Sequence, residues 1–178
     1  MPSPKNVTID DFNGFLASLV PNMTSAGQDT VRALYLDPAS HESIWDRTTA
    51  LISDILTTCH AQVVASSYAA HGDSVFRYIF AVPPAKHGDD LSYTFYSYGD
   101  NPADGLVANT SVASVLPRII TSLSISGIPE FAPSRPLEKY GTKQNVLVIN
   151  KTAVHEHIGD PWKNARCEFW QKGDYFEA

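Results

Sequence analysis

The N-terminal part of the chain has apolar side chains at helical spacing. The apolar residues of Ile9–Leu19 share one face and Thr8 can cap the segment, so a helix is expected there. Further helices are expected over residues 26–36, 44–57 and 59–70, with His41 or Ser43 leading into the second of these. The first part of the chain is therefore predicted to be helical.

The spacing of apolar side chains changes at residue 75. Residues 75–82 are a dense run of β-branched and aromatic side chains that ends at Pro83-Pro84, which predicts a strand buried on both faces. Two shorter strands are expected at 146–149 and 153–157, separated by a turn.

The C-terminal half also carries helical and loop signals. A helix is expected over 112–124, where Pro117 either kinks it or shifts its start. The proline-rich stretch 129–136 is predicted to be a loop, and a final helix is expected over 161–171, with Pro161 in its first turn.

This order of elements predicts an α/β fold with a small mixed sheet flanked by helices. About three strands are too few for an open α/β sheet, and a strand as apolar as 75–82 needs neighbours on both sides. The pattern indicates that the sheet is completed by something further, or that the chain finds a partner.

Length and charge narrow the functional classes. The 178 residues fit one domain, and the net charge of -6 argues against nucleic acid as a main partner. No apolar stretch is long enough to span a membrane, and the polar, proline-containing start of the chain does not resemble a signal peptide. No cofactor is expected.

Cysteines and asparagines supply the next candidates. Cys59 and Cys167 form neither a metal knuckle nor a CxxC pair, and composition alone leaves free thiols and a disulfide equally open. Four Asn-x-Ser/Thr triplets occur, at Asn6, Asn22, Asn109 and Asn150. Such triplets arise often by chance and matter only in a secreted protein.

Four segments, in order, resemble type-B carboxylesterases, the family of cholinesterases and fungal lipases. The most specific is Phe76–Phe95, which looks like the segment carrying the catalytic histidine of that family. Its matching residues are His87, Gly88, Asp89 or Asp90, Tyr93 and Phe95. The other three segments are Ser53-Asp54 followed by Cys59, Gly127-Ile-Pro129, and Cys167-Glu-Phe-Trp170. The resemblance covers about residues 7–171 and is strongest to fungal secreted esterases.

The resemblance implies the C-terminal part of an α/β-hydrolase fold, in a single truncated domain over residues 1–178. It implies that Cys59 and Cys167 form a disulfide and that His87 corresponds to the catalytic histidine. Because the 178 residues contain no G-x-S-x-G elbow and no oxyanion-hole Gly-Gly motif, and the family's acid residue is expected upstream, the chain is not expected to be a self-sufficient esterase.

Three hypotheses for function follow. In the first, the chain pairs with a second chain that carries the serine half and acts on a small apolar ester. In the second, it is a repurposed cyclase or isomerase of a biosynthetic pathway, in which His87 with Asp89 or Asp90 transfers protons to a polyketide- or terpenoid-like ligand. Tyr93 and Phe95 would line its pocket, although core packing is the more frequent role of such an aromatic cluster. In the third, it is a non-catalytic module that binds a partner or forms a homodimer. An idle, inherited histidine remains the alternative reading of His87.

Two further pairs of residues are weaker candidates for a functional site. His155 and His157 would share one face of a strand, but no third metal ligand stands out, so no metal site is expected. Ser53 beside Asp54 looks like half of a catalytic triad, but a helix cap or core hydrogen bond is the expected role.

Overall fold

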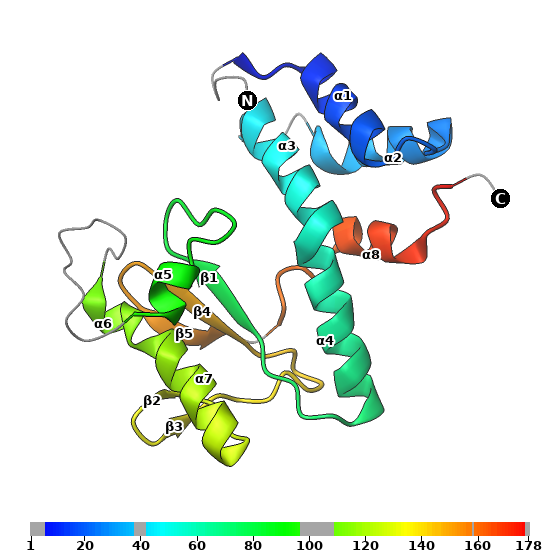
Figure 1. Cartoon of the computed structure of the whole chain (residues 1–178). Coiled ribbons are helices and arrows are strands. Elements are labelled where there is room, and N and C mark those ends of the chain that lie inside the picture. The colour runs from blue at the N-terminus through cyan, green and yellow to red at the C-terminus, as the bar shows by residue number, and fades with distance from the viewer. Residues whose placement is uncertain (1–5, 38–41, 97–108, 158, 177–178) are drawn as a thin grey trace. The chain divides into compact units, whose positions relative to one another are not determined.

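A computed structural model describes residues 6–37, 42–96, 109–157 and 159–176 of the chain (Figure 1). The chain divides into two compact units, one formed by residues 1–64 and 161–178 and the other by residues 65–160. Each unit is described below by itself. The prediction that the chain forms one domain remains a prediction.

The first unit is helical. It contains α1 (Ile9–Leu19), α2 (Ser25–Tyr35), α3 (Ile44–Ser53), a π-helical turn η2 (Asp54–Thr58), the start of α4 (Cys59–His71) and α8 (Ala165–Lys172). The first two helices have the predicted bounds to within one residue. The predicted division into helices 44–57 and 59–70 is wrong, because η2 continues α3 directly into α4.

Capping boxes start α1 and α3. The Thr8 hydroxyl accepts a hydrogen bond from the backbone N–H of Asp11, and the Asp11 carboxylate accepts one from the backbone N–H of Thr8. Ser43 and Asp46 make the same reciprocal pair at the start of α3. These boxes satisfy N–H groups that would otherwise lack an intrahelical partner. Ser43, rather than His41, therefore caps α3; His41 lies outside the described residues.

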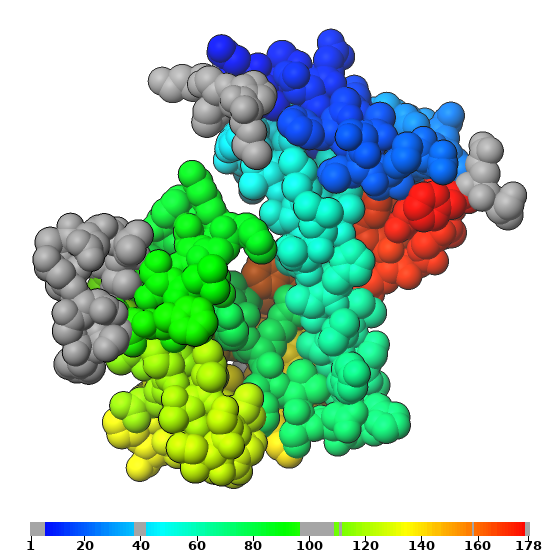
Figure 2. Space-filling view, viewed as in Figure 1, coloured from blue at the N-terminus to red at the C-terminus, as the bar shows by residue number. Residues whose placement is uncertain are grey.

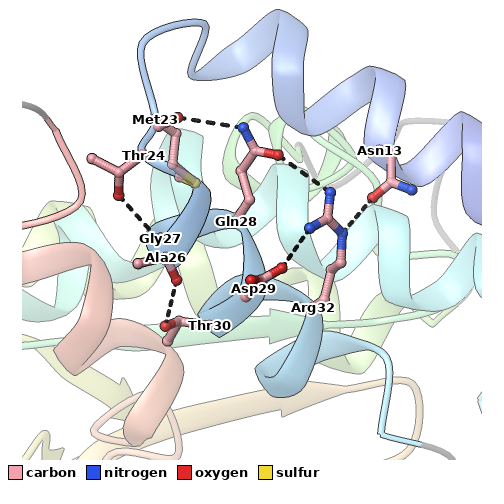
Figure 3. A network of polar contacts seen from close by, with 9 residues as sticks. All are labelled: Asn13, Met23, Thr24, Ala26, Gly27, Gln28, Asp29, Thr30 and Arg32. Carbon is pink, nitrogen blue, oxygen red and sulfur yellow. Dashed lines mark hydrogen bonds and ion pairs between the residues drawn. The ribbon is translucent and has the colours of Figure 1, made fainter.

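One arginine holds α1 against α2 (Figure 3). The Arg32 guanidinium donates to the Asn13 side chain of α1 at 3.0 Å, and to Gln28 and Asp29 of its own helix at 3.2 and 2.9 Å. Beneath this contact lies an apolar core whose fully buried members include Phe12, Val31 and Leu51. Figure 2 shows the surface of α2 meeting that of the C-terminal segment, where the Thr24 N–H donates to the Tyr175 carbonyl at 2.9 Å.

The second unit contains a mixed three-stranded sheet in the order β1-β4-β5. β1 (Tyr78–Ala81) runs parallel to β4 (Val146–Asn150), and β4 runs antiparallel to β5 (Val154–His157). The predicted small mixed sheet flanked by helices is confirmed.

The expectation of a strand buried on both faces at 75–82 is wrong. β1 is shorter, Tyr78 is exposed and Ile79 to Ala81 are half-buried. β1 is an edge strand, since β4 is its one hydrogen-bonded neighbour among the described residues. The central strand is β4, whose Val146, Leu147 and Ile149 are fully buried.

The rest of the second unit packs around this sheet. It comprises the end of α4, α5 (Leu91–Thr94), α6 (Thr110–Ala113), α7 (Val115–Ser126), and a small hairpin of β2 (Glu130–Ala132) and β3 (Arg135–Pro136). The hairpin corrects the prediction of a loop at 129–136. Pro117 lies in the first turn of α7, where its missing N–H costs nothing, so it shifts the start of the helix rather than kinking it.

The start of the last helix was also predicted wrongly. α8 begins at Ala165 instead of Pro161, because the Asn164 side chain accepts from the backbone N–H groups of Arg166 and Cys167 and so acts as the cap. Within the part of the chain that the structure describes, no helix is both long and apolar enough to cross a membrane.

Candidate functional site

His87 lies on an exposed loop that follows the carboxyl end of β1. The chain leaves the strand at buried Val82, turns through a cis Pro83-Pro84 bond, and reaches α5 at Leu91. Ala85 and Gly88 have positive φ angles of 53° and 88°, and these fold the loop tightly back on itself. In α/β folds the carboxyl ends of parallel strands are where ligands bind, so His87 has the position of a functional side chain.

No hydrogen bond or ion pair involves the His87 imidazole among the residues that the structure describes. The ring is exposed to solvent. His87 is thus available to a further group, and in the part of the chain that the structure describes no carboxylate is hydrogen-bonded to its ring.

The two neighbouring acids brace the loop instead. The Asp89 carboxylate accepts from the Lys86 backbone N–H at 2.8 Å, and the Asp90 carboxylate accepts from the Tyr78 hydroxyl of β1 at 3.0 Å. Partial burial of the hydroxyl, together with its bond to Asp90, raises the pKa of Tyr78 to about 12. Neither acid is joined to His87, so their proposed part in proton transfer remains a prediction.

The two aromatic candidates lie in different surroundings. Tyr93 is buried in the core of the second unit, with its ring 5.0 Å from that of Phe80, edge to face. Phe95 is 77% exposed. The structure therefore assigns Tyr93 to packing and Phe95 to the surface, and a joint pocket-lining role remains a prediction.

The predicted disulfide between Cys59 and Cys167 is confirmed, with the two Cα atoms 5.0 Å apart and both residues buried in the first unit. Asp54 lies beside it, and an oxygen of its carboxylate is within 4.8 Å of both sulfurs. Such a trio resembles a metal site, but its sulfurs are bonded to each other and offer no thiolate ligand.

Asp54 belongs instead to a buried polar network that the sequence did not reveal. Its carboxylate accepts from the Tyr35 hydroxyl at 2.8 Å and faces the Arg166 Nε at 3.3 Å, while the Trp170 indole N–H donates to Tyr35 at 2.9 Å. For its neighbour Ser53 the sequence predicts a helix cap or core hydrogen bond, and the Ser53 side chain makes no capping hydrogen bond at η2. Arg166 and Trp170 flank Cys167 by one and three residues, and this is the one local signal that pointed to the network.

The histidine pair on β5 has the predicted geometry. His155 and His157 are exposed on one face of the strand. In the described ranges no acid, cysteine or further histidine joins them in a group of three that could hold a metal ion.

Known proteins are similar to the chain, although no protein-family model matches it. Carboxylesterase patB of Aspergillus clavatus is 26% identical over 177 residues, which cover 96% of this chain and 30% of that protein. The structure of Aspergillus niger EstA superposes on the chain with a TM-score of 0.74 at 18% identity, covering 93% of this chain and 36% of that one.

The chain is carboxylesterase-like. It has part of an α/β-hydrolase fold, and it spans about a third of the length of the proteins that it matches. The resemblance read from the His87 segment and the two cysteines is thereby confirmed at the level of the carboxylesterase relationship.

Proposed function

We propose that this chain is the histidine-bearing part of a carboxylesterase-like hydrolase, in which His87 is the general base for a serine outside these 178 residues. The observation that carries the proposal is the placement of His87. Its imidazole is exposed, unpaired within the described residues, and positioned just beyond the carboxyl end of a parallel strand.

The edge of the sheet supports the same proposal. The backbone groups of β1 that face away from β4 have no strand to pair with among the residues described. In parallel pairing the Leu147 N–H donates to the Arg77 carbonyl at 2.9 Å, so the outward-facing groups are those of Tyr78 and Phe80. A serine-bearing part that added a strand here would extend the sheet and come close to the His87 loop.

The chemistry assigns His87 one task. The imidazole takes the proton of the serine hydroxyl as that oxygen attacks the ester carbonyl, and then gives it to the departing alcohol. The serine, the oxyanion-stabilising N–H groups and the acid that orients the imidazole would all come from outside this chain. Asp89 and Asp90 keep the loop in shape through their bonds to Lys86 and Tyr78.

A chimera tests this proposal. The chain replaces the aligned 30% of the Aspergillus clavatus carboxylesterase, and hydrolysis of a simple aryl ester is measured with and without a serine-directed inhibitor. We expect inhibitor-sensitive hydrolysis that falls by roughly 100-fold or more in the His87→Ala chimera, the usual scale for a lost general base. His155→Ala, an exposed histidine on β5, is the matched control and should leave the rate unchanged.

Two outcomes would contradict the proposal. One is an active chimera in which His87→Ala has no effect on the rate. The other is hydrolysis by the 178-residue chain alone that a serine-directed inhibitor abolishes, because the chain would then contain its own nucleophile.

A further inference from the structure

The first unit has a recess of about 230 Å³ lined by aromatic residues of the C-terminal segment. Trp170, Tyr175 and Phe176 form one wall, Leu19 and Ile55 add aliphatic surface, and Asn22 lies at the same recess. The lining contains no acidic side chain and no lysine or arginine, and His60 is its one imidazole. It therefore suits an uncharged occupant with an apolar face.

The aromatic wall is held in place by its own contacts. Tyr175 lies edge to face on Trp170 at 5.2 Å and is tilted against Phe176 at 4.8 Å between ring centroids. A backbone bridge between Met23 and Phe176 ties the segment to the turn between α1 and α2. The Trp170 N–H is already engaged by Tyr35, so the wall presents ring carbons rather than a hydrogen-bond donor. Phe176 remains 50% exposed, and this leaves apolar surface to be covered.

Asn22 is the first residue of an Asn22-Met23-Thr24 triplet and is exposed in that same turn. Attachment of a glycan requires an asparagine side chain that the folded protein leaves accessible. The three other triplets differ from this one. The Asn150 oxygen accepts from Thr152 and Ala153, the Asn109 amide donates to the Lys151 carbonyl, and Asn6 is exposed but does not line this recess.

The disulfide indicates the compartment in which such a modification occurs. Both cysteines of the chain are joined, and no free thiol remains. Buried structural disulfides persist in oxidising environments, and the secretory pathway, where asparagine is glycosylated, is one of these.

We propose that Asn22 carries an N-linked glycan whose first N-acetylglucosamine lies in this recess against Tyr175 and Phe176. The side-chain nitrogen of Asn22 forms a bond to C1 of the sugar, and the C1–oxygen bond to the lipid pyrophosphate of the oligosaccharide donor breaks. One amide proton leaves with the departing pyrophosphate. The sugar ring has an apolar face of C–H groups that covers the aromatic surface, while its hydroxyl groups at the rim stay in water.

The chain is expressed through the secretory pathway of a yeast, in an Asn6→Gln background, and its glycopeptides are mapped by mass spectrometry. We expect Asn22 to be occupied. The protein trimmed by an endoglycosidase to a single sugar at Asn22 is then compared with the Asn22→Gln variant, which has none at that position. One retained sugar should raise the melting temperature by roughly 2–4 °C, the shift that a modest gain in stability produces at this chain length.

Two variants separate the recess from the mere presence of a sugar. Phe176→Ala should keep the occupancy of Asn22 but lose at least half of the sugar-dependent rise in melting temperature. Phe95→Ala removes an exposed phenylalanine of the second unit and should leave that rise intact. In NMR spectra of the single-sugar protein, C–H protons of the sugar should be shifted upfield by the aromatic rings, and the Phe176→Ala variant should reduce this shift.

An unoccupied Asn22 in the secreted protein would overturn the proposal. A sugar whose protons show no ring-current shift would overturn it as well, because that sugar would project into solvent. So would a rise in melting temperature of equal size in the Phe176→Ala variant.

Discussion

Asp54 is an acid that the first unit buries almost completely, with 2% of its surface exposed. Loss of hydration raises the pKa of the Asp54 carboxyl, and this effect outweighs the hydrogen bond from Tyr35 and the charge of Arg166, both of which lower it. The network therefore stabilises the carboxylate but does not fully offset the free-energy cost of removing its charge from water.

This balance predicts a pH dependence of stability. Because the folded state holds the Asp54 proton more tightly than the unfolded state, the free energy of unfolding should fall as the pH rises from 3.8 through the folded-state pKa. The Asp54→Asn variant has no such proton and still accepts from the Tyr35 hydroxyl. Urea unfolding of both proteins between about pH 4 and 7 should show the wild type losing stability relative to Asp54→Asn as the pH increases. A relative gain in that range would mean that the ion pair with Arg166 dominates.

Single residues were predictable from the sequence where a motif names them, as for His87, Cys59 and Cys167. The network around Asp54 was not, because two of its other members, Tyr35 and Trp170, come from segments 135 residues apart. A local pattern of apolar and polar positions contains no information about which distant hydroxyl or indole will meet a buried acid.

The guanidinium of Arg32 on α2 forms a hydrogen bond to α1. Arg32 is only partly exposed, and its Nε reaches Asn13 on the neighbouring helix while its terminal nitrogens reach Gln28 and Asp29 (Figure 3). An ammonium group cannot make these three contacts in fixed directions.

Replacing Arg32 by lysine should therefore destabilise the chain by about 1 kcal/mol, a typical value for a part-exposed, charge-assisted bond. The loss is measured by urea unfolding monitored by circular dichroism. Arg118→Lys at an exposed position of α7 is the control, since the Arg118 guanidinium has no hydrogen bond or ion pair within the described residues, and it should change stability by less than about half as much. Equal effects of the two substitutions would refute a specific role for the Arg32 guanidinium.

The elements that the sequence predicted best are those with strong caps. Thr8 starts α1 at the predicted residue, whereas α8 begins later than Pro161 predicts, because Asn164 supplies the cap. The hairpin of β2 and β3 was missed because three-residue and two-residue strands that contain or adjoin prolines have almost no alternating pattern.

At the scale of the molecule, the disulfide joins the two chain segments that make up the first unit. Cys59 belongs to the segment before residue 65 and Cys167 to the segment after residue 160, and the two cysteines are 108 residues apart. Closing a loop of this length removes unfolded-state entropy worth about 4–5 kcal/mol in the chain-entropy model. The bridge thus holds together a unit whose two parts are separated by the whole second unit in the sequence.

The shortage of strands was predictable from the sequence, and the structure gives it a location. The sequence predicts that the strand near residue 78 needs neighbours on both sides, and among the described residues only β4 pairs with it. A second neighbour remains a prediction. Which strand would fill the other side is not encoded in residues 75–82, because backbone pairing depends on hydrogen-bond geometry rather than on side-chain pattern.

An edge strand that needs a neighbour should pair with another copy of itself when nothing else is present. We therefore expect the purified chain to show a light-scattering mass above 19.5 kDa that grows with concentration. Tyr78→Lys places a charge on the exposed position of β1, next to Asp90, and should bring the mass back towards that of the monomer. Leu123→Lys adds the same charge to an exposed apolar position on α7 and should not. A constant monomer mass at all concentrations would contradict pairing through β1, and an equal effect of both lysines would attribute association to general apolar surface instead of this edge.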